Sequence, residues 1–195
     1  MTTKEKQQKQ DALWQLLATL GERRCAPKGT MLIRQGAVER TFFFLEQGLA
    51  KAYYESVDGR ILIKSFIREG EIIASMQAIM AGQPSLFNLV TLENSQFLAA
   101  PGGALMEHFE RNPAIHVPLN KLLAHVAMKK ERREYEFLCL SAEQRYLDFC
   151  QNEPELIERI SQADVARYLG ITPVALSRIR RRRRDAISYN ALGRP

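Results

Sequence analysis

Cysteine is scarce in this 195-residue sequence, where Cys25, Cys139 and Cys150 are the three present. They show no Cys-x-x-Cys spacing and their number is odd, which argues against a disulfide framework and against a zinc or iron–sulfur site. Sparse cysteine of this kind favours a reducing compartment. We therefore expect a cytoplasmic protein.

Long apolar segments are also lacking. No apolar run approaches the ~20 residues that a helix needs to cross a bilayer. The segment from Met1 to Asp11 is polar, contains several lysines and lacks the apolar core of a signal peptide. We expect a soluble, intracellular protein with no membrane partner.

Residues that usually carry catalysis or bind metals are few and scattered. The histidines are His108, His116 and His125, and their separations of eight and nine residues do not place them on one chelating face. Glu46 and Glu71 are separated carboxylates without an evident partner. No Ser/His/Asp set, Walker loop or dinucleotide glycine motif is present. These absences predict a protein that is not an enzyme and holds neither a metal nor a cofactor.

The charge is distributed unevenly along the chain. Residues 159–195 contain nine arginines and two aspartates, a net charge of +7, whereas the rest of the chain carries −1 of the total of +6. A basic segment joined to a nearly neutral body is typical of a protein that binds a polyanion.

From Arg23 to about Pro101, short apolar runs alternate with turn signals, which predicts an all-β barrel or roll. Asp58-Gly59 predicts a hairpin with a type I′ turn, whose two central residues need φ > 0. Leucines at spacings of three and four predict a short helix over residues 11–20, and residues 72–80 could form a helix inserted in the roll. The predicted strands are Met31–Ile33, Phe42–Leu45, Leu49–Tyr54, Ile61–Phe66, Leu89–Leu92 and Phe97–Ala99.

Helical periodicity returns after the roll. Asn112 is a predicted N-cap with Pro113 at the first helical position, whereas Pro118 either kinks this helix or marks its true start. An apolar stripe follows at spacings of four, three and four. Such a stripe packs either on the roll or against a second copy of the helix, and the position of this charged-flanked helix between two domains favours a dimer helix. The stripe residues are Ile115, Leu119, Leu122 and Val126.

A further helix is predicted to begin at a capping box formed by Ser141 and Gln144. Its candidate buried residues are Tyr146, Leu147, Phe149 and Cys150. The pair Glu153-Pro154 ends this helix. The apolar residues Leu156, Ile157 and Ile160 then predict a short strand or turn.

The most informative segment is SQADVARYLGITPVALSRIRRRRR, residues 161–184. Ser161 is a predicted N-cap and Gly170 a predicted left-handed helix end, after which Thr172 caps a second helix and Pro173 opens it. The spacing is that of a helix-turn-helix. The small residue Ala166 is followed four residues later by Gly170, and the apolar residues Leu176 and Ile179 lie six and nine residues beyond this glycine. The predicted core residues are Val165, Ala166, Leu169, Leu176 and Ile179.

The outer face of the second helix suits the major groove of DNA, where an arginine can bond a guanine edge in a bidentate manner. The arginine run lies on several faces, so most of it is expected to contact phosphates and to give affinity with little sequence choice. The alternative is a helical hairpin with a solvated charge run. The predicted DNA-binding residues are Thr172, Pro173, Ser177, Arg178, Arg180, Arg181, Arg182, Arg183 and Arg184.

With this motif the chain resembles the cyclic-AMP receptor (Crp/Fnr) family of transcription regulators, in which a β-roll, a dimer helix and a helix-turn-helix follow in the same order. The strongest match is LGITP, residues 169–173, followed by LSRI, residues 176–179. The resemblance places Arg178 on the family's base-reading arginine. It places Pro173 and Val174 where the best-known members carry an arginine and a glutamate that contact DNA, which implies a different operator. The family's wing hairpin after the recognition helix is short or absent here, since only Ala186 to Tyr189 could supply a strand.

The resemblance further implies an effector pocket in the roll. In members that bind cyclic AMP, a Gly-Glu pair holds the ribose and an Arg-Ser pair grips the cyclic phosphate. The aligned positions here are Ala74-Ser75 and Ser85-Leu86, so the cation is missing, and burying a phosphate without a charge partner is costly. Arg68 lies nearby but is not expected to replace it. The family's oxygen sensors use a cysteine cluster near the start of the chain, where only Cys25 lies.

The predicted fold class is α+β, with a jelly-roll sensor domain over residues 1–110, a dimerisation helix over 111–140, and a winged helix-turn-helix with a shortened wing over 141–195. The predicted function is transcription regulation by a homodimer that binds a near-palindromic site in double-stranded DNA without response to cyclic AMP. RNA polymerase is a further candidate partner. Two alternatives stay open, namely a regulator gated by an unidentified small molecule in the roll, and an interaction module that binds nucleic acid without sequence choice.

Overall fold

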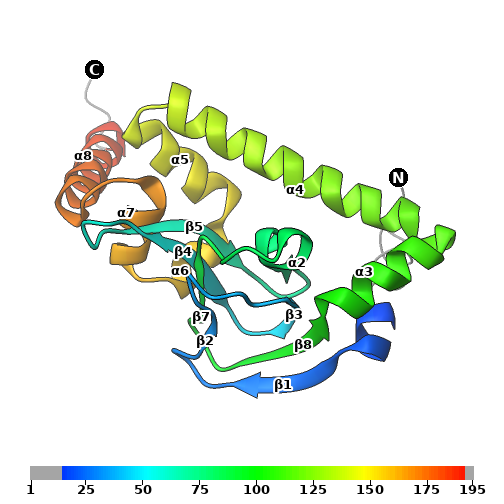
Figure 1. The fold of residues 1–195 in the computed structure, drawn as a ribbon. Coiled ribbons are helices and arrows are strands. Elements are labelled where there is room, and N and C mark those ends of the chain that lie inside the picture. The colour runs from blue at the N-terminus through cyan, green and yellow to red at the C-terminus, as the bar shows by residue number, and fades with distance from the viewer. Residues whose placement is uncertain (1–14, 192–195) are drawn as a thin grey trace.

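The computed structural model describes residues 15–191, without the side chains of residues 114 and 184–191. It contains two antiparallel sheets, with most of the helices following them in the chain (Figure 1). The predicted α+β class is therefore confirmed. One sheet has the order β1 (Glu22–Ala26), β8 (Ser95–Pro101), β3 (Thr41–Gln47) and β6 (Ile72–Ile73). The other has the order β2 (Met31–Ile33), β7 (Asn88–Thr91), β4 (Ala50–Glu55) and β5 (Ile61–Ile67).

Most of these strands were predicted from the apolar runs between turn signals. Each of the six predicted runs overlaps an observed strand, namely β2, β3, β4, β5, β7 or β8. The hairpin between β4 and β5 is confirmed, but its type I′ turn is wrong. Gly59 has φ 77°, whereas no residue other than glycine has positive φ in the described part of the chain, so Asp58 does not. The Gly59 N–H instead donates to the Ser56 carbonyl at 2.8 Å, and this one glycine takes the left-handed position.

The core of the roll lies between the two sheets and consists of apolar side chains from both. Phe43 and Phe97 meet edge to face there, with ring centroids 5.6 Å apart, a geometry that aromatic quadrupoles favour. Apolar groups alone line the space that packing leaves between the sheets, so it offers no partner to a phosphate or a ribose. Its lining residues are Leu32, Phe43, Leu45, Ala50, Ile67, Ile73, Leu89 and Phe97.

Three helices follow or interrupt the roll. The predicted helix over residues 72–80 is partly wrong, because Ile72–Ile73 pair with β3 as β6 and the helix α2 spans Met76–Ala81. Helix α3 (Gly102–Arg111), which the sequence did not reveal, leads into α4 (Pro113–Cys139). Pro113 opens α4 as predicted, and Pro118 lies inside the helix. Residues 15–20 of the predicted first helix are helical, and residues 11–14 lie outside the described residues.

The apolar stripe of α4 divides between two environments. Ile115 is buried against the roll and α3, and Leu119 and Leu122 pack partly on the same cluster. Packing on the roll, the alternative that the sequence left open, thus accounts for Ile115 and for part of Leu119 and Leu122, while a role of the stripe in a dimer stays a prediction. Val126, by contrast, is 39% exposed. The other large apolar side chains exposed along α4 are Val117, Leu123, Met128, Tyr135, Phe137 and Leu138.

Four helices complete the described chain, namely α5 (Ala142–Asn152), α6 (Pro154–Arg159), α7 (Gln162–Leu169) and α8 (Pro173–Ala191). The capping box of Ser141 and Gln144 is confirmed in both directions, at 2.9 and 3.3 Å. The strand or turn predicted around Leu156 is wrong, because Pro154 opens a helix there with Glu155 in its first turn. Residues 186–189, the only candidates for a strand of the shortened wing, belong to α8 and supply none.

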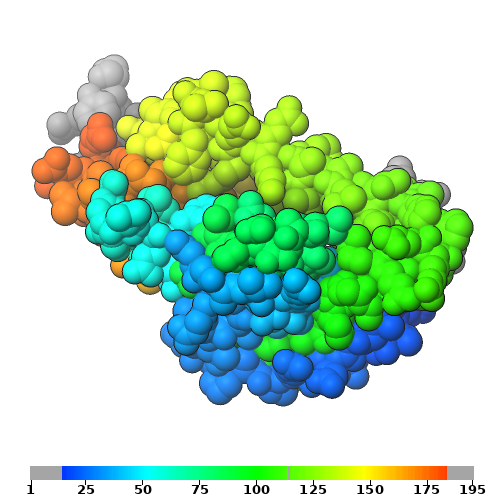
Figure 2. Space-filling view, viewed as in Figure 1, coloured from blue at the N-terminus to red at the C-terminus, as the bar shows by residue number. Residues whose placement is uncertain are grey.

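The C-terminal helices pack directly on the second sheet rather than standing apart from it. Leu49, Ile63 and Phe66 of the roll share one apolar cluster with side chains from α5, α6, α7 and α8. Helix α7 lies against β5, and the space-filling surface is continuous between roll and helices (Figure 2). The helix-turn-helix segment and the roll therefore share buried apolar surface, which stabilises their contact by roughly 25 cal/mol per Å² buried.

Candidate nucleic-acid interface

The turn between α7 and α8 has the geometry that its sequence predicts. The Ser161 side chain accepts a bond from the Asp164 N–H at 3.1 Å and caps α7. Gly170 has φ 69° and its N–H donates to the Ala166 carbonyl, which ends the helix in the left-handed conformation. An added Cβ at Gly170 would lie 2.8 Å from Cε1 of Phe137. The left-handed backbone therefore favours glycine there, and a side chain would in addition have to displace the Phe137 ring of α4.

The start of α8 is fixed by a cap and by two buried side chains. Thr172 Oγ1 accepts a bond from the Ala175 N–H at 3.1 Å, and Pro173 occupies the first helical position. Leu176 and Ile179 are buried beneath the helix. These contacts determine which face of α8 is turned outward.

The outward face carries the predicted DNA-binding residues. Thr172, Pro173, Ser177 and Arg178 are exposed. Within the described residues no carboxylate pairs with Arg178 or Arg181, so both guanidinium groups are open to a ligand. Arg182 lies 3.7 Å from Glu143 of α5, Arg183 is half-buried, and the side chain of Arg184 lies outside the described set. The exposed members of the arginine run are Arg180, Arg181 and Arg182.

Asp164 has a role that the sequence did not reveal. Its position in the first turn of α7 suited the helix dipole, but the side chain is also buried and accepts a bond from Lys51 of β4 at 2.8 Å. A weaker contact joins it to Arg167 at 3.4 Å. No local pattern pairs two residues so far apart in the chain, so only the tertiary structure reveals this link.

The four residues aligned with the effector cassette do not form a cluster of free polar groups. Ser85 is buried, and its Oγ donates to the Phe87 carbonyl at 2.9 Å and accepts from the Phe87 N–H. Ser75 is buried just before α2, Ala74 is half-buried, and Leu86 is 58% exposed. Arg68, the nearby cation, lies 2.7 Å from Glu153 at the end of α5 and is already paired.

Lys64 of β5 is a cation near the cassette that no sequence signal singles out. Its ammonium lies 4.5 Å from the ring centroid of Phe87. Burial, together with the positive charges of Lys130 and Lys129 on α4, lowers the pKa of Lys64 from 10.5 to about 8. Lys129 itself is paired with Glu71 at 2.9 Å. The region between β5 and α4 is therefore positively charged.

The cysteines and histidines considered in the sequence do not gather into one site within the described residues. Cys25 and Cys139 are exposed, Cys150 is half-buried, and all three are free thiols. His116 Nε2 contacts the Phe109 carbonyl at 2.8 Å, and His108 lies 3.4 Å from the Asn112 amide. Within residues 15–191 no three His, Cys, Asp or Glu side chains gather as a metal site would require. No described helix has the length and apolar character that spanning a membrane requires.

Residues 23–112 match the family model of the cyclic nucleotide-binding domain. This match covers the roll and α3, and it defines the class of the N-terminal part. No curated protein matches the chain by sequence. The arrangement of a cyclic nucleotide-binding domain followed by a long helix and a helix-turn-helix is the one that the sequence led us to expect.

Several solved structures have the same arrangement. The c-di-GMP responsive global regulator CLP of Xanthomonas campestris is similar with a TM-score of 0.73 and 19% identity, over 89% of this chain and 91% of its own. FixK2 from Bradyrhizobium japonicum is similar with a TM-score of 0.72 and 15% identity, over 83% of each chain. A transcriptional regulator of the Crp/Fnr family from Eubacterium rectale gives 0.70 and 16%, over 87% and 81%. The chain therefore has the fold of the Crp/Fnr transcription regulators, which confirms the resemblance.

Proposed function

We propose that the protein is a transcription regulator that binds a near-palindromic operator in double-stranded DNA as a homodimer, through the outer face of α8. One observation carries this proposal. Ser177, Arg178 and Arg181 lie on the face opposite the buried Leu176 and Ile179, on a helix whose start is held by a cap and a glycine turn. A helix presented in this way can enter the major groove, where an arginine distinguishes guanine from other bases.

We assign roles within the interface from the charge of each side chain and, for Thr172 to Arg182, also from its exposure. Arg178 is assigned to a base edge, and Thr172, Pro173 and Ser177 to the groove and the adjacent backbone. Arg180, Arg181, Arg182, Arg183 and Arg184 are assigned mainly to phosphates. Phosphate contacts give affinity that falls with salt, whereas base contacts give sequence choice.

We assign residues 1–110 to a sensor-like domain, 111–140 to dimerisation and 141–195 to DNA binding. The dimer would bring together the apolar side chains that α4 leaves exposed, such as Leu123, Val126 and Leu138. Two recognition helices related by a two-fold axis would then meet half-sites ~34 Å apart, in successive major grooves. RNA polymerase stays a predicted partner.

The regulator is not expected to respond to cyclic AMP. The cassette positions supply no cation, Ser85 is bonded to Phe87, and Arg68 is paired with Glu153. A cyclic phosphate placed there would lose its hydration without the arginine that the family's cassette supplies, and the nearby Lys64 ammonium lies over the Phe87 ring.

Selection of random duplex DNA by the purified protein, with and without cyclic AMP, tests this proposal. We expect a two-fold symmetric site to be enriched equally in both conditions. Enrichment that needs cyclic AMP would overturn the effector argument. No enriched sequence in either condition would leave binding without sequence choice, or gating by another small molecule, as the better account.

A further inference from the structure

The connection between α4 and the helix-turn-helix leaves the orientation of α8 to be decided by other contacts. Leu140 and Ser141 are the residues that join α4 to α5. A short covalent joint of this kind allows a domain to pivot unless packing prevents it. The contacts that the C-terminal helices make with the roll and with the end of α4 are therefore the groups that fix where α8 points.

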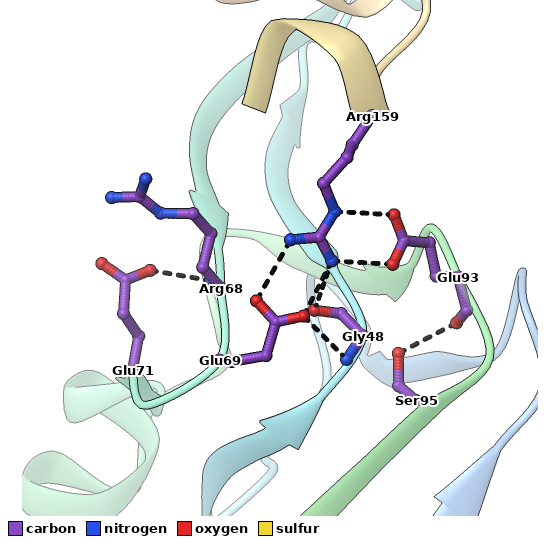
Figure 3. Close-up of polar contacts among 7 residues, drawn as sticks. All are labelled: Gly48, Arg68, Glu69, Glu71, Glu93, Ser95 and Arg159. Atoms are coloured by element: carbon purple, nitrogen blue, oxygen red, sulfur yellow. Dashed lines mark hydrogen bonds and ion pairs between the residues drawn. The ribbon is translucent and has the colours of Figure 1, made fainter. Parts of the chain in front are cut away.

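Arg159, the last residue of α6, makes the most extensive of these contacts (Figure 3). Its Nε and Nη2 donate to the two oxygens of Glu93 at 3.0 and 2.7 Å. Its Nη1 and Nη2 donate to the two oxygens of Glu69 at 3.1 and 2.8 Å. Nη2 also donates to the Gly48 carbonyl at 3.0 Å. We call Arg159, Glu69, Glu93 and the Gly48 carbonyl the Arg159 clamp.

The geometry of the clamp is specific to a guanidinium group. The carboxylates of Glu93 and Glu69 each accept two hydrogen bonds from different edges of the planar guanidinium group, an arrangement that a lysine ammonium cannot reproduce. The hydrogen bonds to Glu93 and Glu69 raise the pKa of Arg159, and the bond from Arg159 lowers the pKa of Glu69. Glu69 additionally accepts from the Gly48 N–H at 3.1 Å, which ties the carboxylate to the roll.

Two further contacts hold the same orientation from other sides. Lys51 of β4 is paired with the buried Asp164 of α7 at 2.8 Å. Arg133 of α4 lies over the rings of Phe137 and Tyr168 and donates to the carbonyls of Ile63 and Tyr168, so it joins α4, β5 and α7. The helix-turn-helix is thus held at α6, at α7 and at the end of α4.

We propose that the Arg159 clamp is a positioning device that sets the separation of the two recognition helices in the dimer, and with it the half-site spacing that the protein accepts. This inference rests on the proposed function. Arg159 donates its hydrogen bonds to Glu69, Glu93 and the Gly48 carbonyl of the roll, so in this role it acts through the orientation of α8 and not by touching DNA. The clamp restricts which operators fit, while Arg178 reads the bases within each half-site.

A spacing series tests this role apart from simple stability. The probes are duplexes that carry two copies of the selected half-site, with their centres moved apart or together one base pair at a time, and a duplex that carries a single half-site. Each added base pair moves the centres by ~3.4 Å and turns them by about one tenth of a helical turn. Glu69→Gln/Glu93→Gln removes both carboxylate charges, Arg159→Lys keeps the cation without the fork, and Glu22→Gln removes an exposed carboxylate paired with Arg24 as a matched control.

We expect the wild type and Glu22→Gln to lose affinity by about tenfold or more when the preferred spacing changes by two base pairs. Glu69→Gln/Glu93→Gln should accept the same series within about threefold, while its affinity for the single half-site stays within about twofold of the wild type. Arg159→Lys should be intermediate. Circular dichroism and thermal unfolding verify that each variant is folded, and Arg159→Lys carries the test if the double variant is not.

Two results would overturn the role of the clamp while leaving the proposed function intact. One is an unchanged spacing preference in the variants. The other is an equal loss of affinity on every duplex, including the single half-site, because destabilisation alone would produce it. If the wild-type protein binds no pair of half-sites better than the single half-site, the proposal that it binds DNA as a dimer is refuted. The role of the Arg159 clamp in half-site spacing is then refuted with it.

Discussion

Arginines in two regions of the C-terminal half occupy opposite environments. On the outer face of α8, Arg178 is exposed and has no carboxylate partner within the described residues. Arg159, in the same basic segment, is paired with Glu69 and Glu93 and faces the roll. The net charge of the segment counts both kinds alike. The comparison teaches that charge locates a nucleic-acid-binding region, whereas the partners of each arginine decide which of them can reach DNA.

Among the charged contacts between the C-terminal helices and the roll, we expect loss of the buried pair of Asp164 and Lys51 to lower the free energy of unfolding most. Asp164→Asn leaves the Lys51 ammonium, 14% exposed, without its carboxylate. Because removing one partner of a buried pair leaves an uncompensated charge, we expect the free energy of unfolding to fall by about 2 to 4 kcal/mol. Urea denaturation measures it. Recovery of stability in Lys51→Met/Asp164→Leu would support this cause, and an Asp164→Asn variant as stable as the wild type would contradict it.

Lys64 gives a smaller effect, with a pH dependence of known sign. Its pKa is about 8 in the folded protein against 10.5 for a free lysine. The unfolded chain therefore binds more protons between these values, and the free energy of unfolding rises with pH across that window. Below it the cost of the buried charge is fully present. We expect Lys64→Met to stabilise the protein by about 1 to 2 kcal/mol at pH 7, a figure reduced for partial solvent exposure.

The test of this sign is urea denaturation of both proteins from pH 7 to pH 10. The gain of Lys64→Met over the wild type should shrink as the pH rises through the lowered pKa. Tyr168, whose pKa burial raises, titrates alike in both proteins and cancels in the difference. A gain that does not change with pH would show that packing on Phe87, not charge, separates the two proteins.

The smallest effect is expected at an exposed pair far from either region. Arg24 and Glu22 lie 3.1 Å apart with both side chains more than half exposed. Water and salt screen such pairs, so Arg24→Gln should change the free energy of unfolding by less than about 0.5 kcal/mol. A loss as large as that of Asp164→Asn would remove the contrast between exposed and buried charges on which the comparison depends.

The sequence predicted what depends on neighbouring residues. The Ser161 cap, the Gly170 turn and the spacing to Leu176 and Ile179 are local, and each took the expected form. The hairpin at Gly59 was found for the same reason. Its turn type was not, because the pair Asp58-Gly59 permits more than one turn and the flanking strands select among them.

What the sequence could not predict depends on distant partners. Arg159 is 66 residues from Glu93 and 90 from Glu69. Ile115 fits the periodicity of a dimer seam and of a packed helix equally well, and the roll decides between them. Residues 186–189 were the only candidates for a strand of the shortened wing, yet α8 continues through them as a helix.

The measurement that tests the central account most directly compares Arg178→Ala with Arg183→Ala on the selected operator and on its single-base variants. If α8 reads bases through Arg178, its loss should cost about 1 to 3 kcal/mol on the operator and flatten the preference at one base pair in each half-site. Arg183→Ala should weaken every sequence by a similar factor and reduce the salt dependence. Equal behaviour of the two variants on all sequences would contradict the account.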